Sequence, residues 1–189
     1  KAVKADVNKE ADQYIPRIKW TADASKLCVM RLNRLQNLLE LYSCDATTGK
    51  ATLFYIEENK AYIEVSNDLT FLKNKKEFIF TSTKDDYNHI YLYDMSGKLK
   101  KQITSGKWDV MEFYGFDESS GNYYFQAAFK SPMEKQVFAI SEKGTKRELS
   151  TEQGTNTATF SKNYKYYFIT NSGINSPHKV SLYFWLGKL

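Results

Sequence analysis

The segment FDESSGNYYF (residues 116–125) places an aromatic residue before a polar turn and the turn before an apolar run. This combination occurs four times along the chain. The runs that follow the last three turns are rich in aromatic side chains, which favour strands because they pack well on a pleated surface. Recurrence at this period is typical of a repeat architecture. The leading aromatic residues lie 51, 45 and 44 residues apart: Trp20, Phe71, Phe116 and Phe160.

Each repeat continues with a second apolar run and then a turn that contains glycine. Glycine readily adopts the positive φ that tight hairpin turns need. The second runs are Leu39–Tyr42, Ile90–Tyr93, Val137–Ile140 and Val180–Tyr183. The glycines lie 48, 47 and 43 residues apart: Gly49, Gly97, Gly144 and Gly187. One more strand is predicted after each of the first three turns, at Ala51–Tyr55, Lys100–Thr104 and Lys146–Ser150.

Four short antiparallel strands in every roughly 40 to 50 residues are typical of a propeller blade. The predicted fold class is therefore all-β, a partial β-propeller of about four blades that forms an arc of a larger ring. A β-sandwich also has short strands and regular turns. A sandwich, however, gives no reason for the aromatic residue and the glycine to recur in phase.

The repeat sets the expected organisation of a single propeller fragment. Residues 1–10 are expected to form the outer strand of a preceding blade. Residues 11–59, 60–110 and 111–153 are expected to form three blades, and residues 154–189 an incomplete blade without its last strand. Such an arc leaves two sheet faces uncovered, so we expect copies of the fragment to associate.

Composition argues against nucleic acid as a partner. The formal net charge is +5, but the lysines are spread through turns such as Lys73–Lys76 and Lys98–Lys101. A nucleic-acid groove needs basic residues focused on one surface together with stacking aromatics. The sequence has no apolar run of about 18 residues, so no membrane span is expected. The chain starts with Lys1 and shows no signal-peptide pattern, which suggests a processed or excised product.

No catalytic constellation is visible in the sequence. It contains no G-x-S-x-G elbow, no Gly-rich phosphate loop and no cluster with metal-ligand spacing. His89 precedes the expected strand Ile90–Tyr93 and His178 follows Pro177 in a loop, and both are interpreted as polar residues at loop ends. We therefore expect no catalytic residue, no metal and no cofactor in this chain.

The two cysteines, Cys28 and Cys44, are too few for a disulfide framework or a zinc site. They are interpreted first as small buried hydrophobic side chains. One alternative stays open. If residues 27–33 and 38–44 form a hairpin centred near Gln36, the cysteines fall opposite each other, and a cross-strand disulfide would need suitable Cβ geometry.

Several segments, in order along nearly the whole chain, resemble the propeller of dipeptidyl peptidase IV-like enzymes of the prolyl oligopeptidase class. A colinear set in phase with the repeat is more specific than any one stretch. The segments are Tyr14–Trp20, Arg31–Asn37, Cys44–Gly49, Thr81–Tyr91, Ile103–Val110 and Phe160–Tyr167.

The resemblance implies that this chain is the second half of an eight-bladed propeller. In such enzymes the propeller covers an α/β-hydrolase domain, whose Ser-Asp-His triad removes dipeptides after a penultimate Pro or Ala. The triad would lie downstream and the acidic pair that holds the substrate amino terminus upstream, so this chain alone is expected to be inert. The implied partners are the hydrolase domain of the same parent chain and such peptides, and the implied location is periplasmic, secreted or at the cell surface.

Two departures from the family limit what can be carried over. Some members direct an aromatic residue and an Arg toward the substrate from the segment that reads Ile-Glu-Val-Ser-Asn-Asp here, residues 63–68. Without that Arg, Glu64 and Asn67 are the candidate substrate-proximal residues. Cys44 resembles a family half-cystine, but residues 51–55 contain no cysteine to pair with it.

Two alternatives remain for the function. The parent resembles a dipeptidyl peptidase, although a tripeptidyl or acylaminoacyl peptidase of the same class has a similar propeller. A stand-alone propeller that acts as a scaffold for binding a protein or a glycan is the alternative from a different class, because no catalytic constellation is present.

Overall fold

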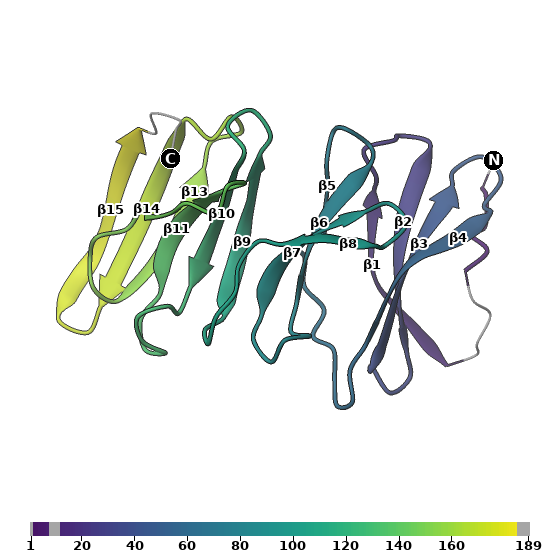
Figure 1. Ribbon diagram of the computed structural model, residues 1–189, viewed down its shortest axis with the longest axis horizontal. Helices are drawn as coiled ribbons and strands as arrows, with labels where there is room; N and C mark the ends of the chain where they lie inside the picture. Colours follow the sequence, from purple (N-terminus) through teal and green to yellow (C-terminus); the bar gives the residue numbers. More distant parts are fainter. Residues whose placement is uncertain (1, 8–11, 185–189) are drawn as a thin grey trace. The chain divides into compact units, whose positions relative to one another are not determined.

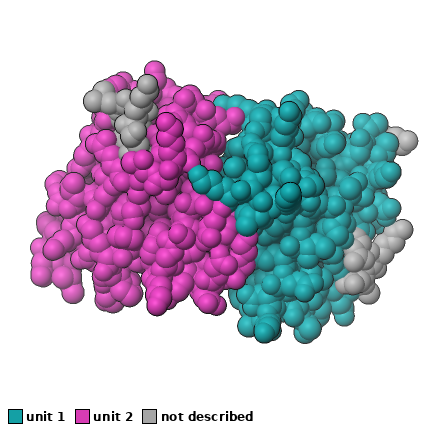
Figure 2. Space-filling view, in the orientation of Figure 1, with its two compact units in different colours: residues 1–80, 92–101 teal, residues 81–91, 102–189 magenta. Residues whose placement is uncertain are grey.

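The computed structural model describes residues 2–7 and 12–184 of the chain, and regular structure in these residues consists of fifteen β-strands in four antiparallel sheets (Figure 1). The chain divides into two compact units, coloured separately in Figure 2. Unit 1 contains residues 1–80 and 92–101, and unit 2 contains residues 81–91 and 102–189.

The first sheet lies wholly in unit 1 and has the order β1-β2-β3-β4. Its two central strands are buried along most of their length, while β1 is largely exposed. This contrast follows from position, since a central strand is covered on both edges by neighbours. The strands are β1 (Gln13–Trp20), β2 (Lys26–Asn33), β3 (Leu38–Asp45) and β4 (Ala51–Glu58).

The second sheet has the order β5-β6-β7-β8, and the boundary between the units runs through it. In unit 1, aromatic residues of β4 meet those of this sheet. The Phe78 ring lies 5.4 Å from Phe54 and stacks on Tyr93 at 5.1 Å, distances at which ring pairs stabilise a core. The strands are β5 (Thr70–Phe71), β6 (Glu77–Ser82), β7 (His89–Asp94) and β8 (Leu99–Gln102).

Unit 2 contains the third and fourth sheets, in the orders β12-β11-β10-β9 and β13-β14-β15. Tyr124, Val137 and Ile169 belong to one apolar cluster between these sheets, and Phe160 packs against it. The third sheet contains β9 (Val110–Asp117), β10 (Asn122–Ala127), β11 (Gln136–Ser141) and β12 (Lys146–Glu148). The fourth sheet contains β13 (Thr155–Phe160), β14 (Tyr166–Gly173) and β15 (Ser176–Phe184).

Each sheet is built from consecutive strands joined in chain order, which is how a propeller blade is made. The predicted all-β partial propeller is therefore confirmed. A sandwich would divide the strands between two sheets, so that alternative is wrong. The predicted strand of residues 1–10 falls partly on residues 1 and 8–10, and the predicted glycine turn at Gly187 falls wholly outside the described residues.

The glycine turns have the conformation that the repeat predicted. Gly49, Gly97 and Gly144 adopt φ of 77°, 81° and 89°, in the turns that end β3, β7 and β11. At Gly97 there is a second requirement, because a Cβ there would lie 2.0 Å from the carbonyl oxygen of Phe54. That approach places the turn of one sheet directly against the backbone of another within unit 1.

The hairpin of β2 and β3 forms, but its register separates the two cysteines. Cys28 lies opposite Ser43 and Cys44 lies opposite Leu27. Neighbouring residues of a strand point to opposite faces, so the cysteines occupy opposite faces of the sheet. The centre of the hairpin falls between Leu35 and Gln36, half a residue from the predicted centre. Both thiols are free and buried, which excludes the disulfide.

Candidate functional site

A groove of about 270 Å³ in unit 1 runs between β1 and the segment that leads into β5. Its floor contains the apolar side chains of Met30 and Leu69 and the thiol of Cys28. Polar donors stand along its edges. The lining residues are Arg17, Ile18, Lys19, Cys28, Met30, Ser66, Asn67 and Leu69.

A β-bulge at Pro16 places the two cationic side chains in this groove. Tyr14 pairs with Leu32 and Arg17 pairs with Met30, so Ile15 and Pro16 together face one residue of β2. Proline has no N–H to give to the ladder and is found in strands mainly at edges and bulges. The extra residue reverses the faces of the strand beyond it. As a result, Arg17 lies on the same face as Met30.

The register beyond the bulge brings Lys19 to the same groove. Lys19 pairs with Cys28, two positions along from the pair of Arg17 and Met30. Its ammonium donates a hydrogen bond to the carbonyl oxygen of Leu69. Burial lowers the pKa of Lys19, and the carboxylate of Asp68 acts in the opposite direction. Burial also raises the pKa of the Cys28 thiol to about 12, so the floor of the groove is neutral and Cys28 is no nucleophile.

Arg17 is held in place from two sides. Its Nε donates a hydrogen bond to Oδ1 of Asn67 at 2.5 Å. Its Nη1 donates to the carbonyl oxygen of Pro16 at 2.7 Å. The first bond joins β1 to the segment before β5, so the guanidinium has a fixed orientation although it lies at the surface.

The two predicted substrate-proximal residues differ in their position relative to the groove. Asn67 lines the groove and contacts Arg17, whereas Glu64 is exposed and is not among the lining residues. Ile63 explains the difference, because its side chain is buried and its N–H donates to the carbonyl oxygen of Gln36 at 2.9 Å. The next side chain, Glu64, is exposed to solvent. The roles of Glu64 and Asn67 toward a substrate stay predictions.

Sequence reasoning missed Arg17 and Lys19. Both belong to the stretch Tyr14–Trp20 that carried the family resemblance, but their alternation alone does not say which face they occupy. The proline inside a run with strand character was the available signal for a bulge. Even with that signal, the segment of residues 66–69 reaches the groove only through the tertiary fold.

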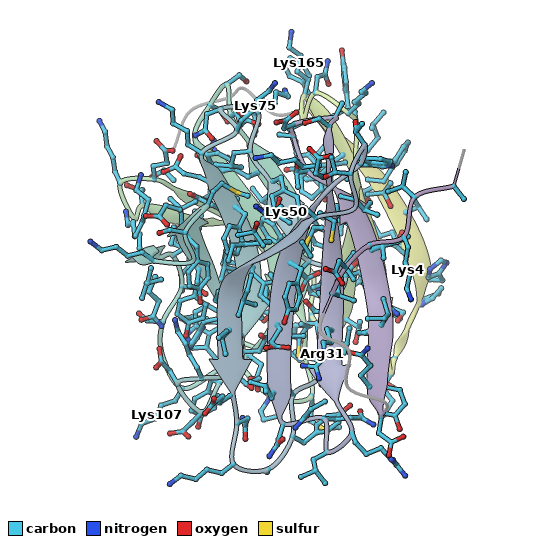
Figure 3. All side chains as sticks on the ribbon, turned by 90° about the vertical axis from the view of Figure 1, so that its right-hand side faces the viewer. Lys4, Arg31, Lys50, Lys75, Lys107 and Lys165 are labelled. Atoms are coloured by element: carbon cyan, nitrogen blue, oxygen red, sulfur yellow. The ribbon has the colours of Figure 1, made fainter. Side chains whose placement is uncertain are left out.

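Another cation of unit 1 is already neutralised. Arg31 lies among the strands of the first sheet (Figure 3), where it is fully buried and forms an ion pair with Glu40. Its Nε donates to the side chain of Gln13. Removal of either partner of such a pair would leave an uncompensated charge buried among the strands, so Arg31 has a structural role.

A second groove in unit 1, of about 400 Å³, lies over the turns. It has as many acidic as basic residues, so it has no preference for one sign of charge. Two of its carboxylates, Asp23 and Asp45, accept hydrogen bonds from their own turns. The charged lining residues are Asp23, Lys26, Asp45, Lys50, Lys75 and Glu77.

The two histidines lie in strands of different sheets. His89 is the first residue of β7 and is fully buried, not a polar loop-end residue as predicted. Its Nδ1 lies 3.2 Å from Oγ1 of Thr104 and its Nε2 lies 3.0 Å from the carbonyl oxygen of Gly106, so both ring nitrogens have structural partners. His178 is exposed and lies in β15, where a loop was predicted.

In the described part of the chain, no group of three or more His, Cys, Asp or Glu residues could hold a metal ion. The described residues also include no helix of the length and apolar character needed to cross a membrane.

The outer face of the fourth sheet is apolar and exposed. Alternate residues of β14 and β15 point to it, with Tyr166 opposite Phe184 and Phe168 opposite Leu182. Phe168 is 48% and Leu182 is 61% exposed. Contiguous apolar surface of this kind usually marks a site of contact with another element or molecule.

The sequence and the fold of this chain are similar to those of known proteins. Residues 2–178 match the family described as the dipeptidyl peptidase IV (DPP IV) N-terminal region. The crystal structure of Porphyromonas gingivalis dipeptidyl peptidase 4 is similar with a TM-score of 0.90 and 41% sequence identity, over 95% of this chain and 26% of that chain.

Two curated relatives are more distant. The inactive dipeptidyl peptidase 10 of Mus musculus is 26% identical over 149 residues, which are 74% of this chain and 19% of the relative. The probable dipeptidyl-aminopeptidase B of Sclerotinia sclerotiorum is 26% identical over 180 residues, 86% of this chain and 19% of the relative. The chain thus spans about a fifth to a quarter of these proteins. With the family matched over residues 2–178, the resemblance found in the sequence is confirmed: the chain belongs to the dipeptidyl peptidase IV N-terminal region family.

Proposed function

We propose that this chain is the non-catalytic propeller portion of a dipeptidyl peptidase IV-type serine exopeptidase. The observation that carries the proposal is the similarity of 95% of the chain, at 41% identity, to a quarter of a bacterial dipeptidyl peptidase 4. The partner is the α/β-hydrolase domain of the same parent chain. The substrates are peptides with a penultimate Pro or Ala.

In this proposal the propeller limits access to the substrate cavity and shapes its wall. The first strands of propeller blades surround the central channel, and β1 and β5 are the first strands of their sheets. Glu64 and Asn67, just before β5, are proposed to lie close to the substrate. The blades are proposed to span residues 11–59, 60–110, 111–153 and 154–189, after an outer strand in residues 1–10.

The exposed face of β14 and β15 supports a larger parent. Phe168 and Leu182 would be covered by a further blade, as the opposite face of the same strands is covered within unit 2. A periplasmic, secreted or cell-surface location is proposed for the parent. Cell fractionation with an antibody against this chain tests that location, and recovery in the cytosol alone would contradict it.

A peptidase assay tests the proposed function. A Gly-Pro chromogenic dipeptide is incubated with this chain and with the full-length parent, and hydrolysis is expected from the parent alone. A series of Gly-Pro peptides of increasing length, ending with one fused to a folded domain, tests access control. The parent should cleave the short peptides and spare the bulky one, whereas equal rates would contradict a gating role.

One observation favours a second candidate. A matching relative is named as an inactive dipeptidyl peptidase, so a parent without peptidase activity, acting as a binding scaffold for a protein or glycan, fits the same family. A parent that cleaves no member of the peptide series, yet retains a partner on an affinity column, would support this candidate over the first.

A further inference from the structure

We propose that the groove of Arg17, Lys19 and Asn67 binds a carboxylate group of a peptide that lies in the central channel. This inference rests on the proposed function for the identity of the ligand as a peptide. The ligand chemistry itself, an anionic carboxylate with an adjoining methylene stem, comes from the groove.

The residues that line the groove include positively charged side chains but no negatively charged side chain. Two of the eight are cationic and none is acidic. Asp68 lies near Lys19 and interacts with its charge, but it does not line the groove. The groove therefore keeps a net preference for an anion, unlike the larger groove over the turns, where acids and bases are equal in number.

Donors in the groove exceed the acceptors that the fold provides for them. Among the described residues, Arg17 uses Nε and Nη1 in hydrogen bonds and Nη2 has no protein partner. The ammonium of Lys19 has three N–H donors, and one of them bonds to the Leu69 carbonyl oxygen. Because Oδ1 of Asn67 accepts from Arg17, its Nδ2 remains a donor without a partner in the described structure.

The guanidinium is oriented before any ligand arrives. Its bonds to Asn67 and to the Pro16 carbonyl hold the planar group in place, and Nη2 keeps its N–H donors for a ligand. Hydrogen bonds between an arginine and a carboxylate are charge-assisted and roughly twice as strong as those between neutral groups. Preorganisation lowers the entropy cost of binding, so a small ligand is sufficient.

The size of the groove limits the ligand. At about 270 Å³ it is smaller than the usual range for whole small-molecule ligands. It matches a single side chain or a chain terminus. The apolar floor of Met30 and Leu69 suits methylene groups, while the donors at the edge suit a carboxylate. An aspartate or glutamate side chain and a C-terminal carboxylate are the two sources of such a group.

A titration of this chain tests the inference without any need for catalysis. N-acetyl-glutamate amide carries a side-chain carboxylate, N-acetyl-glycine a terminal carboxylate, and N-acetyl-glutamine amide no charge. Binding is followed by NMR chemical shifts. We expect the acidic probes to bind and the neutral probe to bind about tenfold more weakly or not at all, because hydrogen bonds to charged groups are the stronger ones. The two acidic probes distinguish the two sources.

Matched variants show whether the groove is responsible. Arg17→Gln should weaken the binding of an acidic probe about tenfold, and so should Lys19→Gln. Lys165→Gln removes an exposed lysine of a turn in unit 2 (Figure 3) and should leave binding unchanged. Thermal unfolding of each variant verifies its fold. Equal affinity for the acidic and neutral probes, or equal loss in Lys165→Gln, would overturn the inference.

Peptidase kinetics of the full-length parent are a second test of the inference. If it cleaves Gly-Pro peptides, those with glutamate downstream of the proline should have a lower KM than those with glutamine. Arg17→Gln should abolish this difference, and Lys165→Gln should keep it. A KM difference that persists in Arg17→Gln counts against the groove. If the parent cleaves no peptide, the proposed function fails and the titration still decides whether the groove binds carboxylates.

Discussion

The hydroxyl of Tyr55 donates a hydrogen bond of 2.7 Å to the buried carboxylate of Glu57. The two residues lie two positions apart on β4, so their side chains share one face. The Tyr55 oxygen also lies 3.3 Å from the hydroxyl of Tyr93. Burial raises the pKa of Tyr55, and the negative charge of Glu57 raises it further, so Tyr55 remains a neutral donor.

Tyr55→Phe should therefore destabilise unit 1 while leaving its aromatic packing in place. The ring contact with Tyr93, at 4.9 Å between centroids, is kept, but Glu57 loses a donor. We expect a loss of about 1 to 3 kcal/mol in the free energy of unfolding, measured by urea denaturation. Tyr62→Phe changes an exposed tyrosine and should alter that free energy by less than about 0.5 kcal/mol. Equal effects of the two substitutions would refute this account.

Alanine substitutions at two glycine turns can distinguish the cost of backbone strain from the cost of a steric contact. Gly97 and Gly144 have similar φ, 81° and 89°. A Cβ at Gly97 would meet the carbonyl oxygen of Phe54 at 2.0 Å, whereas nothing lies within 4 Å of one at Gly144. Gly144→Ala should cost about 1 to 2 kcal/mol from the left-handed conformation alone. Gly97→Ala should cost more, because backbone must also move. A smaller loss for Gly97→Ala, in the same urea titration, would contradict the close approach.

The repeat allowed the sheets to be predicted because the strand period and the glycine turns are local signals. Gly49, Gly97 and Gly144 each combine a fixed place in the repeat with a positive φ, so sequence and structure agree there. The fold class follows from that agreement. What remained open in the sequence was register, which depends on single residues.

Two details of register that the sequence left open account for most of what sequence reasoning missed. The bulge at Pro16 moved Arg17 and Lys19 to the groove face, and a half-residue shift of the β2–β3 hairpin separated Cys28 from Cys44. A slip of one residue moves a side chain to the other face of a sheet. Asn67 was predicted from the family pattern, but its contact with Arg17 joins residues fifty apart in the chain, and no local signal reports such a contact.

Acid should weaken the turn between β7 and β8. Oδ1 of Asp94 accepts hydrogen bonds from Oγ and N of Ser96, at 2.5 and 2.8 Å, and from N of Lys98 at 3.1 Å. The side-chain bond from Ser96 is the main reason why the pKa of Asp94 is lowered. A carboxyl whose pKa is lower in the folded state stabilises that state above its unfolded pKa, about 3.9, and this contribution is lost as the pH falls further.

The free energy of unfolding, measured from pH 6 to pH 2, should therefore fall less steeply below about pH 4 in Asp94→Asn than in the native chain. Asparagine keeps an acceptor for the Ser96 groups but does not titrate. Ser96→Ala should raise the pKa of Asp94, measured by NMR, because it removes the hydroxyl donor. If the free energy of unfolding of Asp94→Asn fell below pH 4 as steeply as that of the native chain, this turn would not contribute to the pH dependence of stability.

The exposed face of β14 and β15 should make copies of this chain associate when no further blade covers it. Leu182 and Phe168 lie opposite each other at its centre, and burying them against a second copy removes apolar surface from water. Light scattering after gel filtration should show a concentration-dependent dimer or larger species. Leu182→Lys should shift the chain toward monomer by placing a charge in that contact. Leu35→Lys changes a residue that is 74% exposed at the tip of the β2–β3 hairpin and should leave the association unchanged. A native chain that stays monomeric at the highest attainable concentration would show that this face is not self-complementary.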